Sequence, residues 1–150
     1  MMKQAAILVL LSLAAAVATQ WLHPGAPSWY LVEAPLRSDE VNLAEVDQRW
    51  QGQVVWLDAR PRDQFEKGHI PGAHLLNEQE FDTLVFENME LLQHLQVEPN
   101  PVVVYCSGQS CKASHAVRDR LVTSSLVPEN IYVLREGWPA WEAEGRPIEK

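Results

Sequence analysis

Apolar and polar positions along the chain alternate in blocks that predict strands separated by helices. Short runs of β-branched and other apolar residues predict strands at residues 54–57, 102–105 and 131–134, with a weaker candidate at 73–76. Helical spacing of apolar residues predicts helices at residues 43–51, 61–67, within 78–96, 113–121 and 138–143. Strands that alternate with helices form a parallel sheet. We therefore predict an α/β fold of three layers, a mostly parallel sheet with helices on both faces.

Local capping signals indicate where two of these helices begin and end. Asn42 is followed three residues later by Glu45, which is a capping-box pattern and places a helix start at residue 43. Pro61 near the first position and Gly68 after the last position delimit a brief helix.

The first 22 residues follow a different pattern, that of a targeting segment. Lys3 precedes a largely apolar run at residues 5–18, and residues 16–18 offer a small-x-small cleavage site. Extended to residue 22, the run reaches the lower length limit of a transmembrane helix. Residues 1–22 are therefore expected to be a cleaved signal peptide or an uncleaved membrane anchor.

The rest of the chain divides into a linker and a domain. Residues 23–40 contain three prolines and are predicted to be a linker, and residues 41–150 are predicted to form the folded domain. In a bacterial chain, the leader places this domain outside the cytoplasm. We expect it to be anchored in the membrane facing the periplasm or exterior, or soluble in the periplasm after cleavage.

Composition and charge narrow the classes of function. The chain has 12 Lys and Arg residues against 20 Asp and Glu residues, a net charge of −8, which argues against a nucleic-acid partner. Apolar residues make up 47% and charged residues 21%, an ordinary globular composition that excludes a disordered chain. Two cysteines are too few for a disulfide scaffold.

The segment after the strand at residues 102–105 carries the candidate chemistry. Cys106 stands between that strand and a predicted helix, at the edge where parallel sheets bind ligands. Small or flexible residues follow it and can turn their N–H groups inward: Ser107, Gly108, Gln109 and Ser110. Such a nest stabilises an anion, so we expect a lowered pKa for the Cys106 thiol and a nucleophilic thiolate. A buried structural cysteine is the alternative.

Cys111 leaves several interpretations open. The C-x4-C spacing allows a disulfide with Cys106, and Cys111 could equally be a resolving thiol for an oxidised or sulfur-loaded Cys106. His115 is four residues beyond Cys111, so the three side chains could ligate a metal. The spacing matches no standard zinc motif, however, so no metal is expected and His115 is predicted to be an exposed helix residue.

Three segments, taken in order, resemble the rhodanese (sulfurtransferase) domain. The first comprises LDAR at residues 57–60 and FEKGHIPGA at residues 65–73, and the second is the Cys106 loop after its apolar strand. The third comprises residues 133–141, VLREGWPAW, and residues 145–147, GRP. The resemblance spans about residues 41–148, which is the whole predicted domain.

The resemblance implies a sulfurtransferase and a set of site residues. Cys106 would take sulfane sulfur from a small donor, form a persulfide and pass the sulfur to a thiol acceptor, with no cofactor. The substrate-binding loop would consist of Ser107, Gly108, Gln109, Ser110, Cys111 and Lys112. Lys112 stands where a related phosphatase group has an arginine, and a point charge lacks the fork that suits phosphate. Phosphatase activity is therefore disfavoured.

The other motif residues are predicted to be structural: Asp58, Arg60, Gly68, His69, Pro71 and Gly72. Asp58 and Arg60 are expected to pair or to hold neighbouring loops, and His69 to hydrogen-bond its own turn.

Two alternatives to sulfur transfer remain. A thiol-redox protein would cycle a disulfide between Cys106 and Cys111, and a catalytically inactive module would only present the fold to a partner.

Overall fold

The computed structural model describes residues 36–108 and 112–150. The predicted leader at residues 1–22, most of the linker, and Gln109, Ser110 and Cys111 lie outside the described residues.

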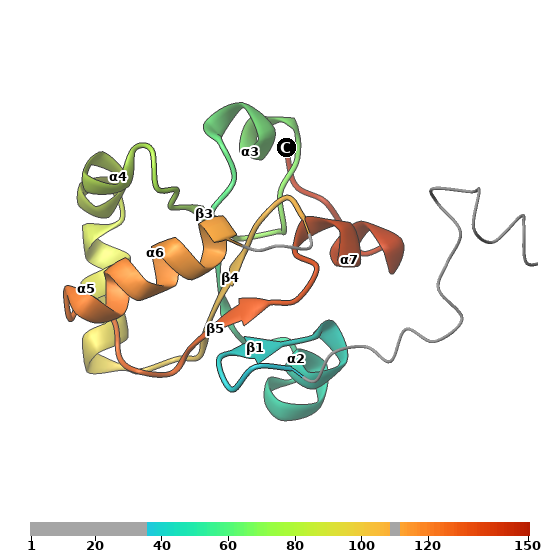
Figure 1. The fold of residues 1–150 in the computed structure, drawn as a ribbon, viewed down its shortest axis with the longest axis horizontal. Coiled ribbons are helices and arrows are strands. Elements are labelled where there is room, and N and C mark those ends of the chain that lie inside the picture. The colour runs from blue at the N-terminus through green and yellow to red at the C-terminus, as the bar shows by residue number, and fades with distance from the viewer. Residues whose placement is uncertain (1–35, 109–111) are drawn as a thin grey trace, which may run out of the picture. The chain divides into compact units, whose positions relative to one another are not determined.

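The described residues form a parallel sheet of five strands in the order β1-β5-β4-β2-β3 (Figure 1). The strands are β1 (Glu40–Val41), β2 (Val55–Asp58), β3 (His74–Leu75), β4 (Val102–Tyr105) and β5 (Ile131–Leu134). β4 is the central strand, and its register pairs Asp58 with Tyr105 and Val104 with Val133. The carboxyl ends of β2 and β4 therefore lie side by side.

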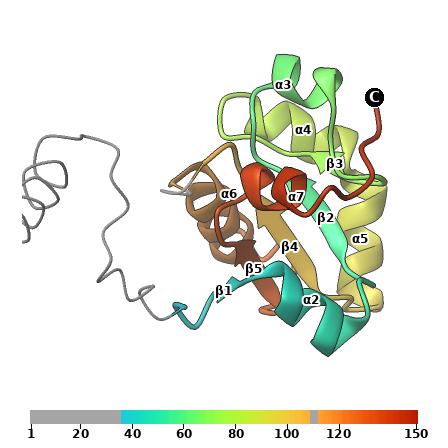
Figure 2. The same cartoon turned by 90° about the vertical axis from the view of Figure 1, so that its right-hand side faces the viewer.

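Helices cover both faces of the sheet, as the alternating pattern predicts (Figure 2). They are α2 (Leu43–Trp50), α3 (Arg62–Lys67), α4 (Phe81–Glu87), α5 (Met89–Val97), α6 (Lys112–Thr123) and α7 (Trp138–Ala143). One core packs α4, α5 and α6 against the sheet, and a second core packs α2 and α7 against the opposite face. The α/β three-layer fold is confirmed.

The central strand serves both cores because successive side chains of a strand point to opposite faces. Val102 and Val104 join the core beneath α6, whereas Val103 and Tyr105 join the core beneath α7. All four are fully buried. This explains why the strand is an unbroken apolar run in the sequence.

The first helix begins with the predicted capping box. The Glu45 amide donates to Asn42 Oδ1 at 2.8 Å, and the Asn42 amide donates to a Glu45 carboxylate oxygen at 3.1 Å. Two amides that lack partners within the helix are thereby satisfied.

Two elements differ from the sequence prediction. Residues 78–96 contain two helices, which meet at Asn88 because its side-chain amide donates to the carbonyl oxygens of Leu75 and Leu84. β1 was not predicted, and it includes Glu40 from the predicted linker. Its two residues are ordered by parallel pairing with β5, a contact across more than 90 positions that no local pattern encodes.

The helices of the described part are all too short or too polar to cross a membrane.

Helix α5 offers a direct test of the core. Leu95 is fully buried, whereas Val97 on the same helix is 81% exposed. Leu95→Ala should lower the free energy of unfolding by about 2–5 kcal/mol, because it leaves a cavity in the core. Val97→Ala should change it by less than about 0.5 kcal/mol. Urea unfolding measures both, and similar losses in the two variants would contradict this packing.

Candidate functional site

Cys106 is the first residue after the central strand β4, at the carboxyl edge of the sheet. Its side chain is 5% exposed and packs with Val133 and Ala113. Its Sγ lies 3.3 Å from the carbonyl oxygen of Gly108, to which the thiol can donate a hydrogen bond. Helix α6 begins at Lys112, whose side chain is exposed.

The backbone of Cys106 is held by the turn before α7. The Trp138 amide donates to the Cys106 carbonyl oxygen at 2.7 Å. Gly137 adopts a φ of +59°, and a Cβ at this position would lie 2.1 Å from the same oxygen. Only glycine allows this approach. The contact of Gly137 with Cys106 joins segments 31 residues apart and has no local signal in the sequence.

A buried ion pair lies beside this contact. Arg60 Nη2 is 2.7 Å from Asp58 Oδ2 and also donates to the Gly68 carbonyl oxygen at 2.7 Å. Asp58 is fully buried and Arg60 is 4% exposed. Burial acts to lower the pKa of Arg60, but its hydrogen bond to Asp58 and the charge of that carboxylate outweigh burial, so the pKa lies above its ordinary value. The guanidinium therefore stays charged.

Two aromatic rings enclose the Arg60 guanidinium. Its Cζ lies 4.1 Å from the centre of the Trp138 ring and 5.4 Å from that of Tyr105. The Tyr105 hydroxyl accepts a hydrogen bond from the Ile70 amide at 3.2 Å. Burial, followed by the charge of Asp58, raises the pKa of Tyr105 well above its ordinary value. The phenol is therefore neutral in the folded protein.

The turn that contains Gly68, His69, Pro71 and Gly72 binds the C-terminal residues. The backbones of His69 and Glu149 form a reciprocal pair of hydrogen bonds, each 2.9 Å long. The Gly72 amide donates to a Glu149 carboxylate oxygen at 2.8 Å. His69 Nδ1 lies 3.0 Å from the Phe65 carbonyl oxygen within the same turn. This docking of Glu149 was missed by the sequence analysis, because the two segments are distant in the chain.

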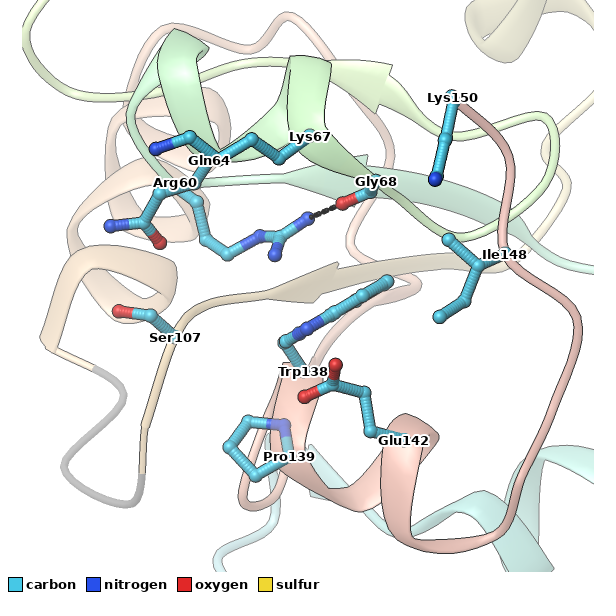
Figure 3. Close-up of a pocket in the computed structure, with 10 residues that line it drawn as sticks. All are labelled: Arg60, Gln64, Lys67, Gly68, Ser107, Trp138, Pro139, Glu142, Ile148 and Lys150. Carbon is cyan, nitrogen blue, oxygen red and sulfur yellow. Dashed lines mark hydrogen bonds between the residues drawn. The ribbon is translucent and has the colours of Figure 1, made fainter.

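A pocket of about 440 Å³ opens between α3, α7, the C-terminal residues and the cysteine loop (Figure 3). Ser107, which follows the buried Cys106 in the cysteine loop, lines this pocket. Three cationic side chains, Arg60, Lys67 and Lys150, line it together with one carboxylate, Glu142. The pocket is thus locally basic in a chain whose net charge is −8.

His115 corrects one expectation. It was predicted to be an exposed helix residue, but its side chain is only 17% exposed. Its Nδ1 lies 3.4 Å from Asp39 Oδ2 and its Nε2 lies 3.3 Å from Glu40 Oε1, so it joins α6 to the start of the sheet. Among residues 36–108 and 112–150, no three His, Cys, Asp or Glu side chains are placed to hold a metal ion.

The chain matches the model of a protein family. The model of the Rhodanese-like domain matches residues 42–144, which is more than half of the chain.

Individual proteins agree with this match. A rhodanese-related protein from Thermoplasma volcanium has 19% sequence identity and a TM-score of 0.53, covering 73% of this chain and 96% of its own. The As-Sb reductase from Leishmania major has 19% sequence identity and a TM-score of 0.55, and the match covers 71% of this chain and 78% of the reductase. At these identities the likeness concerns the fold alone.

An HTH-type transcriptional regulator from Mycobacterium tuberculosis is 28% identical over 114 residues, which is 75% of this chain. The match covers 45% of the regulator, so the chain spans less than half the length of this curated relative.

The close approach at Gly137 predicts a position-specific loss of stability. Gly137→Ala and Gly145→Ala both place a Cβ at positive φ, but nothing lies within 4 Å of the added atom at Gly145. Each should lose about 1–3 kcal/mol of unfolding free energy from backbone strain. Gly137→Ala should lose more, because its Cβ overlaps the Cys106 carbonyl. Equal losses of unfolding free energy in the two variants, measured by urea unfolding, would contradict the close approach of Gly137 to the Cys106 carbonyl.

The buried Tyr105 phenol predicts a loss of stability at high pH. Below about pH 10 both the folded and the unfolded states keep the proton, so Tyr105 adds no pH dependence. Above about pH 10 only the unfolded chain releases it, so the free energy of unfolding falls by up to ~1.4 kcal/mol per pH unit.

Tyr105→Phe should therefore show a shallower fall than the wild type in urea unfolding above about pH 10. Tyr132→Phe, a change outside this network, is the matched control. If the unfolding free energy of the wild type and of Tyr105→Phe fell equally steeply with pH, the raised pKa of Tyr105 would be contradicted.

Proposed function

The chain belongs to the rhodanese-like domain family, and on this premise we propose that it is a sulfurtransferase with Cys106 as its nucleophile. A sulfane-sulfur donor and a thiol acceptor would react at the same cysteine in turn.

In the first step, the Cys106 thiolate attacks the outer sulfur of the donor. A sulfur–sulfur bond forms at Cys106, the bond between that sulfur and the rest of the donor breaks, and the leaving group departs with the electron pair. With thiosulfate the leaving group is sulfite. The product is a persulfide on Cys106, and no external oxidant or reductant is consumed.

In the second step, an acceptor thiolate attacks the terminal sulfur of the persulfide. The bond between the two sulfurs breaks, Cys106 leaves as a thiolate, and the acceptor carries the sulfur away. Both steps pass through anionic sulfur, which the nest of loop amides that the sequence predicts after Cys106 would stabilise without a general base or a metal. Lys112 would add a positive charge at the start of α6.

The observation that carries this proposal is the setting of Cys106. It directly follows the central strand, at the edge where ligands bind in parallel sheets, and its carbonyl accepts a hydrogen bond from the Trp138 amide. Ser107, the next residue, lines the basic pocket, so an anionic donor bound there would lie beside the start of the cysteine loop.

Mass spectrometry of the sulfur-loaded protein tests the proposal. The reduced protein, incubated with thiosulfate or with an organic persulfide, should gain the mass of one sulfur atom on Cys106. Cys106→Ser should gain none. Cys111→Ser should still load, because the first step needs a single thiol.

The other outcomes distinguish the alternatives. Absence of an adduct with either donor would overturn the proposal. A loss of two hydrogen masses on oxidation, reversed by reductant and abolished in Cys111→Ser, would favour the thiol-redox alternative. A Cys106→Ser protein that retains its biological function would favour the binding module.

A further inference from the structure

We propose that His115 is a positioning residue for Cys106, and that it holds its position fully only while both ring nitrogens are protonated. The inference deepens the proposed function, because Cys106 is the nucleophile of the proposed sulfur transfer. His115 would act through helix α6, which carries it, and would take no part in bond making.

The His115 ring lies between two carboxylates. Its Nδ1 is 3.4 Å from Asp39 Oδ2, and its Nε2 is 3.3 Å from Glu40 Oε1. The three side chains are between 14% and 17% exposed, so water screens these contacts only in part. A neutral imidazole has one N–H donor, whereas the imidazolium has two. Only the protonated ring can therefore donate to both carboxylates, and in the neutral ring a bare nitrogen faces a carboxylate oxygen.

The other charged groups of this cluster keep their charge near neutral pH. Arg118 Nη1 is 3.9 Å from the Asp39 oxygen that faces His115, and it is 2.8 Å from Asp119 Oδ1. Arg37 Nε is 3.6 Å from the other Asp39 oxygen. His115 is therefore the group whose charge changes in this range. The strands β4 and β5 present apolar residues to α6: Val102, Val104, Ile131 and Val133.

The contacts of His115 enclose Cys106 between α6 and β5. On α6, Ala113 lies in the same turn as His115 and packs against Cys106. On the sheet, Val133 packs against Cys106, and its amide donates to the Asp39 carbonyl oxygen at 2.8 Å. His115 joins these two sides, so a weaker contact with Asp39 would let the first turn of α6 move away from the sulfur.

The neighbouring residues of the same turn do not supply a second polar tie. Ser114 is fully buried, and within the described part of the chain its hydroxyl has no hydrogen-bond partner. Lys112 is exposed. The polar side-chain contacts that hold this turn to the start of the sheet are therefore those of His115.

Deprotonation of the ring weakens this arrangement as the pH rises. Imidazole groups titrate between about pH 5 and pH 8. At the low end of this range both carboxylates receive a hydrogen bond from His115, and at the high end only one does. The positioning of Cys106 should therefore decline with rising pH, while the fraction of thiolate increases.

The variant Glu40→Gln separates the charge of His115 from its contacts. A carboxamide offers both an N–H donor and an oxygen acceptor, so it can donate to the neutral ring, which a carboxylate cannot do. In this variant the tie no longer needs a second proton on His115. Glu129→Gln, the same change at an exposed residue after the C-terminal end of α6, is the matched control.

The rate of alkylation of Cys106 by iodoacetamide reports its positioning without requiring sulfur transfer. Cys111→Ser in the full chain leaves Cys106 as the single cysteine, and this protein is the parent. Mass spectrometry gives the rate between about pH 5 and pH 8, where imidazole titrates. Each variant's rate is divided by the parent's rate at the same pH, which cancels the intrinsic ionisation of the thiol. Sulfur loading from thiosulfate is measured in the same way.

The alkylation ratio for Glu40→Gln should rise with pH by about two- to fivefold, which corresponds to about 0.4–1 kcal/mol from a partly exposed ion pair. Loss of a negative charge alone would favour the thiolate and raise the ratio most at low pH, the opposite trend. The ratio for Glu129→Gln should stay constant. His115→Gln, introduced into both the parent and Glu40→Gln, should abolish the rise because no ring then titrates in the cluster.

A constant alkylation ratio for Glu40→Gln would overturn the inference. If the pH dependence of urea unfolding still differed between parent and variant, His115 would contribute to stability alone, which also contradicts a positioning role. Failure of the proposed function has a different signature. A wild type that gains no sulfur would overturn sulfur transfer, whereas an alkylation ratio that rises with pH would still support the positioning of the thiol.

Discussion

The buried pairing of Asp58 with Arg60 is the interaction on which the site depends. Taking two charges out of water is costly, and removing one partner of such a pair typically costs about 3–5 kcal/mol because the other charge is left unpaired. Here the cost is offset by further contacts: the Arg60 amide donates to Asp58, and the guanidinium reaches the Gly68 carbonyl and the Trp138 ring. Trp138 in turn fixes the Cys106 carbonyl. One ion pair thus links a strand end, a turn and the candidate nucleophile.

The parts of the fold that could be predicted are those encoded by neighbouring residues. The strands at residues 102–105 and 131–134 and the helix at residues 138–143 have the predicted bounds, because each follows from a local pattern of apolar and turn residues. β1 and the break at Asn88 depend on hydrogen bonds to distant segments or to a preceding strand. The spacing of apolar residues along the sequence does not predict such contacts.

The same distinction applies to the candidate site. The position of Cys106 between a strand and a helix follows from the alternation of patterns. The contact of Gly137 with Cys106 and the pocket that Lys67 and Lys150 line do not, since each depends on segments brought together only by the fold. Asp58 and Arg60 stand out in the sequence as a motif, but the enclosure of the guanidinium by Tyr105 and Trp138 required the structure.

The pairing of residue 149 with the turn at residue 69 has a practical consequence for handling the protein. An affinity tag or a fusion partner attached after Lys150 would emerge at the rim of the pocket, where it could crowd the entrance or compete electrostatically for the lysines. An acidic extension at that position would therefore bias measurements of the preference for anionic ligands. Recombinant versions intended for enzymology should carry their tag ahead of residue 36 and leave the opposite end unmodified.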